Sequence, residues 1–241
     1  MPDNFRVYSA GPLTLVALIV VIGLIIIVIP LLFLGLAGKA ITSLVGLSWL
    51  SATALVILIL LCSFVDVPIW KIKRKTIRMP HSEDGRFPDA FTPDQDGGLW
   101  ETTIAVNLGG AIIPLALSLY LLDRVSLIAS GNMLYLKVLA GILIVGAMSY
   151  VTTRPMVGVG IRASLFIPGL TALLCGVLLA GGTGLSAGVI AFVSGAVGTL
   201  LGANIAHLYR VGDLEVAKIS IGGAGTFGAI FVGCLLSALI A

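Results

Sequence analysis

Charged residues are scarce in this chain. Lys, Arg, Asp and Glu make up 10% of its 241 residues, whereas hydrophobic residues make up 59%. A water-soluble domain of this size covers its surface with far more charge. The mean hydropathy of +1.15 agrees with this imbalance. Composition therefore argues against a soluble protein and predicts an integral membrane protein.

Cysteine pairs and catalytic motifs are lacking as well. The three cysteines, Cys62, Cys175 and Cys234, lie within apolar runs and have no CxxC spacing, so we expect small packing residues rather than a metal or disulfide site. The sequence has no phosphate-binding loop, dinucleotide fingerprint, HExxH or GxSxG motif. We therefore expect no cofactor and no metal, and an enzyme of the soluble ATPase or hydride-transfer type is disfavoured. The net charge of +3 is carried beside apolar runs, which indicates lipid headgroups rather than nucleic acid as partner.

Long apolar runs are what the chain has instead. About 20 helical residues cross a hydrocarbon core of about 30 Å, and runs without strict alternation indicate helices rather than barrel strands. The sequence thus predicts an all-α integral membrane protein, one polytopic domain over residues 1–241 with about seven transmembrane helices. The predicted spans are Pro12–Gly38, Ile41–Phe64, Trp100–Leu122, Leu134–Val151, Ser164–Gly181, Leu185–Leu208 and Val216–Ala241.

The basic residues predict an orientation for these spans. Of the 14 Lys and Arg residues, Lys39, Arg124 and Lys137 fall on one side of a seven-span topology, and the other eleven share the side of the N-terminus. Cytoplasmic loops carry the excess of Lys and Arg. We therefore expect a multi-pass protein of the plasma membrane, with its N-terminus in the cytoplasm and its C-terminus outside.

Two connections are unusual. Residues 65–99 are rich in Pro, Gly and charge, which predicts a cytoplasmic loop or cap, with short strands near Ile69–Ile77. The segment Thr152–Ala163 is apolar yet full of helix breakers, so it is expected to re-enter the membrane or to cap a cavity.

Polar residues and glycines at membrane depth mark the candidate site, because unpaired polar groups are costly there. They gather in the third, sixth and seventh predicted spans. One interpretation is helix packing alone, since small residues let membrane helices approach closely. The other is a binding site, in which His207 relays protons. The candidate residues are Asn107, Asn204, His207, Ser220, Gly222, Gly223, Gly225, Thr226 and Gly228.

The seventh predicted span differs from the others in its glycine content. Four glycines fall within Gly222–Gly228, and each weakens a helix by about 1 kcal/mol relative to Ala. The sequence therefore predicts a kinked or discontinuous seventh helix, whose free backbone groups are available to a ligand.

Several of these patches resemble a prokaryotic family of polytopic membrane proteins, domain of unknown function 1614. The resemblance runs from the second predicted span to the C-terminus, and the string Ser-Ile-Gly-Gly-Ala-Gly-Thr-Phe is its most specific part. It rests on Val65–Pro68, Val106–Gly110 with Pro114, Arg154–Ile161, Gly198–Asn204 and Ser220–Phe231. The resemblance implies a membrane protein without an assigned activity.

The chain departs from the pattern of that family at three positions. The pattern usually has Asp at the positions of Asn204 and Gly228 and commonly Asn at the position of Asp66. Two membrane aspartates on adjacent helices suggest an aspartyl intramembrane protease, whose carboxyl pair activates water. This chain lacks both carboxylates, so proteolysis by this copy is disfavoured.

Three functions stay open from the sequence. The first is permeation of a small solute or ion through a site between spans three, six and seven. The second is a non-catalytic scaffold or complex subunit, either a homo-oligomer or part of a membrane complex, packed through glycine faces. The third is an inactive or divergent relative of an intramembrane aspartyl hydrolase. The lipid bilayer is the expected partner in all three.

Overall fold

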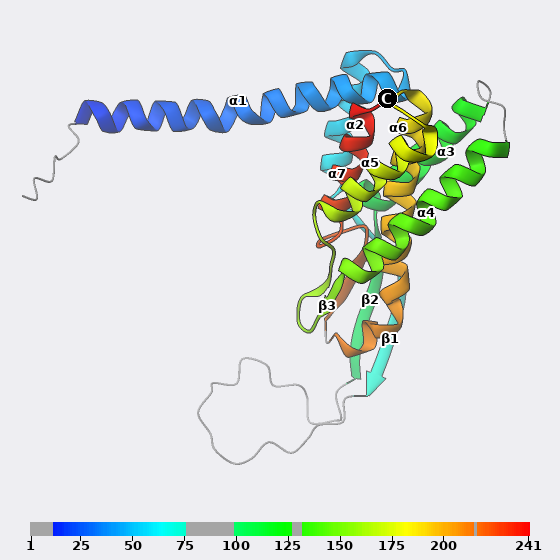
Figure 1. Cartoon of the computed structure of the whole chain (residues 1–241). Helices are drawn as coiled ribbons and strands as arrows, with labels where there is room; N and C mark the ends of the chain where they lie inside the picture. Colours follow the sequence, from blue (N-terminus) through cyan, green and yellow to red (C-terminus); the bar gives the residue numbers. More distant parts are fainter. Residues whose placement is uncertain (1–11, 76–98, 127–131, 215) are drawn as a thin grey trace, which may run out of the picture.

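The computed structural model describes residues 12–75, 99–126, 132–214 and 216–241. Helices run side by side and form most of the molecule, and strands gather at one end of them (Figure 1). The helices are α1 (Pro12–Val45), α2 (Trp49–Cys62), the π-helical η1 (Leu108–Ile112), α3 (Ile113–Ser126), α4 (Asn132–Thr152), α5 (Ile167–Ala180), α6 (Leu185–Val193), the π-helical η2 (Ser194–Gly198) and η3 (Leu200–Asn204), the 3₁₀ helix η4 (Ile205–Asp213) and α7 (Phe227–Leu239). The strands are β1 (Asp66–Lys75), β2 (Leu99–Asn107), β3 (Arg154–Met156), β4 (Gly160–Arg162) and β5 (Lys218–Ile221).

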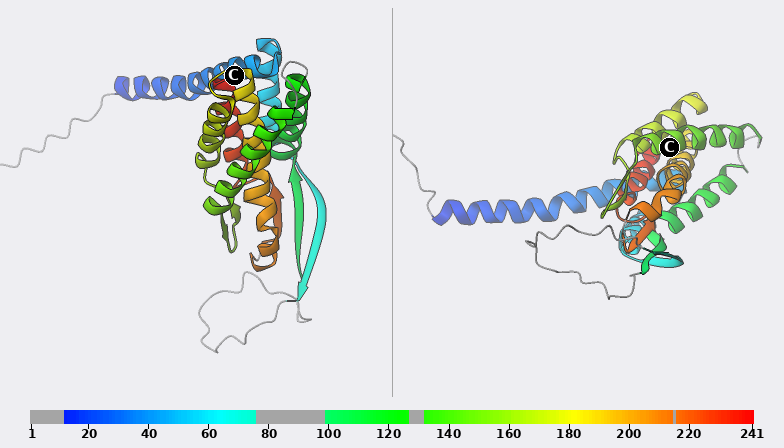
Figure 2. Two further views of the ribbon diagram at one scale, coloured as in Figure 1. Left: turned by 45° about the vertical axis from the view of Figure 1, so that its right-hand side comes forward. Right: turned by 90° about the horizontal axis from the view of Figure 1, so that it is seen from below.

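Three continuous helical stretches among the described residues are long and apolar enough to cross a membrane: Leu108–Val125, Met133–Thr152 and Leu185–Arg210. The pair Pro30–Val45 and Trp49–Cys62 adds a fourth if it counts as one span, but its two helices meet at 110°. Helix α1 accordingly projects sideways from the bundle (Figure 2). The helices α5 and α7 are apolar but have 14 and 13 residues. The structure thus supports three or four membrane-spanning helices, and the prediction of seven is not confirmed.

The third predicted span, Trp100–Leu122, begins in a strand and not in a helix. Residues from Trp100 to Asn107 form strand β2, and the helix begins at Leu108. Half of this segment is polar, and it contains the β-branched residues Thr102, Thr103, Ile104 and Val106, which favour a strand. The prediction of an all-α protein is therefore wrong in this part of the chain.

The seventh predicted span is discontinuous, as the glycines predicted. Its first residues form strand β5, and helix α7 starts only at Phe227. The turn between them places Gly222 at φ 74° and Gly225 at φ 98°, in the left-handed region that other residues rarely adopt.

The sheet has the strand order β1-β2-β5. Strands β1 and β2 are antiparallel from Asp66 opposite Asn107 onward, and β2 and β5 are parallel, with Thr103 opposite Lys218. The strand predicted near Ile69–Ile77 is confirmed as far as Lys75, whereas residues 76–98 of the predicted loop lie outside the described residues. Segment Thr152–Ala163 forms the two-stranded β3–β4 hairpin at the same end of the bundle as the sheet.

Glycines set the distance between the helices of the bundle. A Cβ built on Gly202 would overlap the carbonyl oxygen of Gly146 on α4, and one on Gly198 would lie 3.0 Å from the carbonyl oxygen of Ile142. These contacts at Gly198 and Gly202, which are four residues apart, agree with the interpretation that small residues let the helices pack closely. Cys175 and Cys234 are buried free thiols in the core, as packing residues would be.

Candidate functional site

Asn107 joins the sheet to the helices. It ends β2 and caps η1, because its Oδ1 accepts a hydrogen bond from the Gly110 N–H at 2.8 Å. Its Nδ2 donates to the carbonyl oxygen of Ser63 at 2.6 Å and to Asp66 Oδ1 at 2.9 Å. The side chain is 1% exposed. Asn107 therefore has its amide fully used in holding α2, β1 and η1 together.

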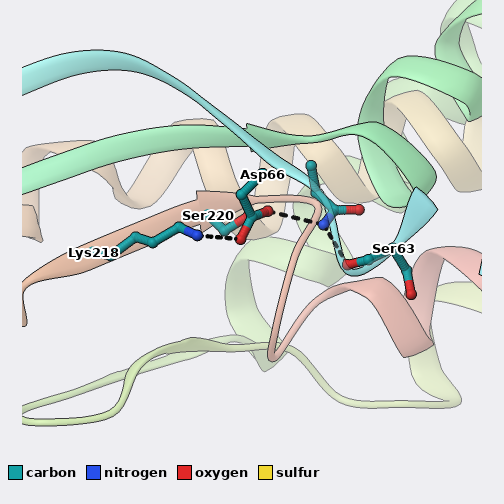
Figure 3. A network of polar contacts seen from close by, with 5 residues as sticks. Ser63, Asp66, Lys218 and Ser220 are labelled. Atoms are coloured by element: carbon teal, nitrogen blue, oxygen red, sulfur yellow. Dashed lines mark hydrogen bonds and ion pairs between the residues drawn. The ribbon is translucent and has the colours of Figure 1, made fainter. Parts of the chain in front are cut away.

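Asp66 is the centre of a polar network that crosses the sheet (Figure 3). Its Oδ1 also accepts a hydrogen bond from Ser220 Oγ at 2.5 Å, and its Oδ2 lies 2.6 Å from Lys218 Nζ. Lys218 and Ser220 are two residues apart on β5, so both side chains emerge from one face of the strand. The Asp66 side chain is 18% exposed and that of Lys218 is 50% exposed. The network ties the first strand of the sheet to the last.

The network also determines the charge state of Asp66. Burial pushes the pKa of its carboxyl group upward, but the hydrogen bonds from Lys218, Ser220 and Asn107 and the positive charge of Lys218 outweigh this effect. The pKa of Asp66 therefore lies below its ordinary value. At neutral pH the site holds one carboxylate and one ammonium group side by side.

A pocket of about 250 Å³ opens beside this ion pair. Its polar wall consists of Asp66, Lys218 and Ser220. Other lining residues belong to the β3–β4 hairpin and to the turn before α7. The complete lining is Asp66, Val159, Gly160, Ile161, Lys218, Ile219, Ser220 and Ala224.

The glycine-rich turn is packed against this network. A Cβ on Gly110 would overlap the carbonyl oxygen of Gly222, so two backbones cross here in direct contact. A Cβ on Gly223 would overlap Ser220 Oγ and come within 3.3 Å of Asp66 Oδ1. These positions need glycine because the polar network and η1 leave no room for side chains.

The rest of the turn is held by contacts with the hairpin and within the turn itself. The carbonyl oxygen of Gly225 accepts a hydrogen bond from the Ala163 N–H at 2.9 Å, which attaches the turn to the end of the hairpin. The Thr226 hydroxyl donates to the carbonyl oxygen of Gly223 at 3.3 Å and is fully buried. Gly228 lies on the first turn of α7, where an added Cβ would meet only the end of the Leu165 side chain, at 2.7 Å.

Asn204 lies elsewhere, on the π-helical continuation of α6 beside α4. It is 0% exposed, and among the described residues neither its Oδ1 nor its Nδ2 has a hydrogen-bond partner. The hydroxyl groups of Thr199 on the same helix and of Ser149 and Thr153 at the end of α4 are also buried without partners in the described part of the chain. Since α4 packs against η2 and η3, these four groups belong to one pair of helices.

His207 follows on the 3₁₀ helix. Its Nδ1 lies 3.1 Å from the carbonyl oxygens of both Gly202 and Ala203, so Nδ1 carries the proton that it donates to them. Its ring stacks on Tyr150 with the centroids 4.8 Å apart, and the residue is 4% exposed. In this arrangement His207 stabilises the junction between η3 and η4.

The structure therefore divides the predicted residues into groups. Asn107, Ser220 and Gly223 meet around Asp66, and Gly222 packs against Gly110 beside them. Asn204 lies on the helix that packs against α4, and His207 stacks on Tyr150 of α4. Lys218, the charged partner of Asp66, was absent from the prediction. Local sequence patterns do not reveal the parallel pairing of β2 with β5, which brings together residues more than 150 positions apart.

No group of three or more His, Cys, Asp or Glu side chains that would hold a metal ion occurs within the described residues.

Comparison with known proteins finds a match to a family model only. No curated protein and no solved structure matches the chain. The family model described as "Protein of unknown function (DUF1614)" matches residues 60–240, from the end of α2 to the end of α7. The match covers the whole of the site just described and most of the chain, which therefore belongs to this family.

Proposed function

We propose that this protein lets a small polar solute cross the membrane, with the buried amide of Asn204 as its central contact. The observation that carries the proposal is the pair of unpartnered amide atoms on Asn204, which lies within the longest candidate span of the described chain, Leu185–Arg210. Each buried polar atom without a partner costs about 1 to 3 kcal/mol. The cost of this unpartnered amide supports the presence of a ligand or water that forms hydrogen bonds with it.

The neighbouring groups indicate which solutes suit this position. Thr199, Ser149 and Thr153 add three unpartnered hydroxyl groups along the contact between the two helices, counted within the described residues. All four side chains are uncharged, and each offers both a donor and an acceptor. A neutral hydrogen-bonding molecule fits these groups better than an ion, because they supply no charge to offset the loss of its hydration.

Flux through purified protein in liposomes tests the proposal. Water and a panel of small uncharged polar solutes are offered to vesicles with the unaltered chain, with Asn204→Leu and with Ile205→Leu. Asn204→Leu replaces the amide with an apolar group of similar size and is expected to abolish flux. Ile205 is 47% exposed on the same helix, so Ile205→Leu serves as the matched control and should conduct normally. If no solute moves faster than through empty vesicles, or if both variants conduct equally, the proposal is wrong.

A second candidate is an inactive relative of an intramembrane aspartyl hydrolase. A Cβ built on Gly195 would lie 3.9 Å from the carbonyl carbon of Gly233, so α7 runs beside the helix that carries Asn204. Both position 204 and position 228 lie between that contact and the sheet, and Gly228 has room for a side chain if Leu165 moves. The double variant Asn204→Asp, Gly228→Asp tests this candidate. Cleavage of a transmembrane peptide by the double variant, and by neither single variant, would favour it over permeation.

A further inference from the structure

The polar wall of the sheet-end pocket keeps hydrogen-bonding capacity that the fold does not use. Asp66 Oδ1 is occupied by Asn107 and Ser220, whereas Oδ2 accepts from Lys218 alone within the described chain. The ammonium group of Lys218 has three N–H donors, and the one described residue that binds it is Asp66. Two N–H donors and one carboxylate lone pair are therefore directed toward a ligand or solvent.

The charges of the pocket restrict that ligand. A simple anion would gain from Lys218 but would be repelled by Asp66 close by, and a simple cation would meet the reverse balance. A molecule with both charges gains from both groups. The volume of about 250 Å³ lies below the range of roughly 300 to 1,000 Å³ typical of pockets for drug-sized ligands, so the molecule must be small.

The remaining walls fit such a ligand. Gly160 and Ala224 bring backbone with little or no side chain to the pocket, and Val159 and Ile161 supply apolar contact. Among the residues that line the pocket, Asp66 and Lys218 are the two charged ones.

We propose that this pocket binds a small zwitterion, a molecule such as a free α-amino acid whose carboxylate and ammonium groups are a few bonds apart. Its carboxylate accepts hydrogen bonds from Lys218 Nζ, and its ammonium group donates to Asp66 Oδ2. The two charge pairs then lie antiparallel, so that the ligand binds without breaking the Asp66–Lys218 contact (Figure 3). The site lies in the sheet, outside the candidate spans, and does not depend on Asn204.

Calorimetric titration of the full chain in lipid nanodiscs tests the inference. Glycine and alanine are compared with acetate and ethylammonium, each of which carries only one of the two charges. We expect saturable binding of glycine and alanine, and binding about tenfold or more weaker for either half-ligand, because each lacks one charge-assisted contact. Lys218→Met should weaken glycine binding by a similar factor.

The sheet offers a matched control for Lys218→Met. Lys71 pairs with Glu101 at 3.6 Å on β1 and β2, outside the pocket, so Lys71→Met removes the same charge and should leave glycine binding unchanged. Equal binding of acetate and glycine, absence of binding by both amino acids, or equal loss in both lysine variants would overturn the inference. If Lys218→Met does not fold, the comparison of half-ligands on the unaltered chain still decides. Glycine binding that persists in Asn204→Leu while flux is lost separates this site from the proposed function.

Discussion

The crossing of two backbones at Gly110 and Gly222 gives a quantitative prediction. Gly222→Ala places a Cβ about 2.7 Å from the carbonyl carbon of Gly110 and 2.9 Å from the Cβ of Ala111. Relieving such overlap in a packed interior costs about 1 to 3 kcal/mol. Holding Ala at φ 74° adds about 1 to 2 kcal/mol. We expect the free energy of unfolding to fall by about 2 to 5 kcal/mol.

A second glycine supplies a control for the cost of holding Ala at a positive φ. Gly158 has φ 75°, almost identical to that of Gly222, yet a Cβ built there has nothing within 4 Å. Gly158→Ala should therefore cost only about 1 to 2 kcal/mol. Both variants are measured by reversible unfolding in mixed micelles, followed by circular dichroism. Equal losses in the two variants would refute the claim that η1 and the turn before α7 are in direct contact.

Three further predictions concern other parts of the molecule. Asn204→Leu should abolish flux without lowering the free energy of unfolding, because the amide has no hydrogen-bond partner among the described residues; a destabilised variant in thermal unfolding contradicts this. The folded-state pKa of Asp66 lies below its ordinary value of 3.8, so its contribution to stability is complete above about pH 4 and is lost as pH falls through that lowered pKa. Acid unfolding should accordingly depend less on pH in Asp66→Asn, and identical acid transitions would argue against the network. Single cysteines placed at Arg154 and at Ala241 should react with an impermeant maleimide from opposite sides, Arg154 from the cytoplasm; labelling from one side only contradicts the topology.

The helices are the part of the fold that was accessible from the sequence. The prediction Leu134–Val151 lies within α4 as observed, and Leu185–Leu208 begins at the first residue of α6. These segments have a high mean hydropathy despite a few polar residues, so hydropathy locates them directly. It fails at Trp100–Asn107 and Val216–Thr226, because each segment adjoins an apolar helix and contains apolar residues of its own, yet the first forms strand β2 and the second forms strand β5 and the glycine-rich turn. Only the β-branched residues and the glycines of these two segments distinguish them from membrane helices.

Asn107, Ser220 and the glycines of the turn could be named from the sequence, but the arrangement that joins them to Asp66 and Lys218 could not. A buried amide such as that of Asn107 was expected to need partners, and the glycine-rich segment was expected to be non-helical. The partner Asp66 and its ion pair with Lys218 follow from strand pairing across most of the chain. Local patterns carry no information on such pairing. Asn204 was grouped with these residues, but it lies against α4 instead.

The parallel pairing of β2 with β5 has a consequence for biosynthesis. Strand β5 follows all described helices except α7 in the chain, and domains assemble from the N-terminus as synthesis proceeds. Asp66 leaves the ribosome long before Lys218 and Ser220, so its carboxylate has no charged partner from β5 during most of translation. The sheet and its pocket are thus completed late, and a nascent chain that stops before β5 contains most of the described helices but lacks the third strand of the sheet.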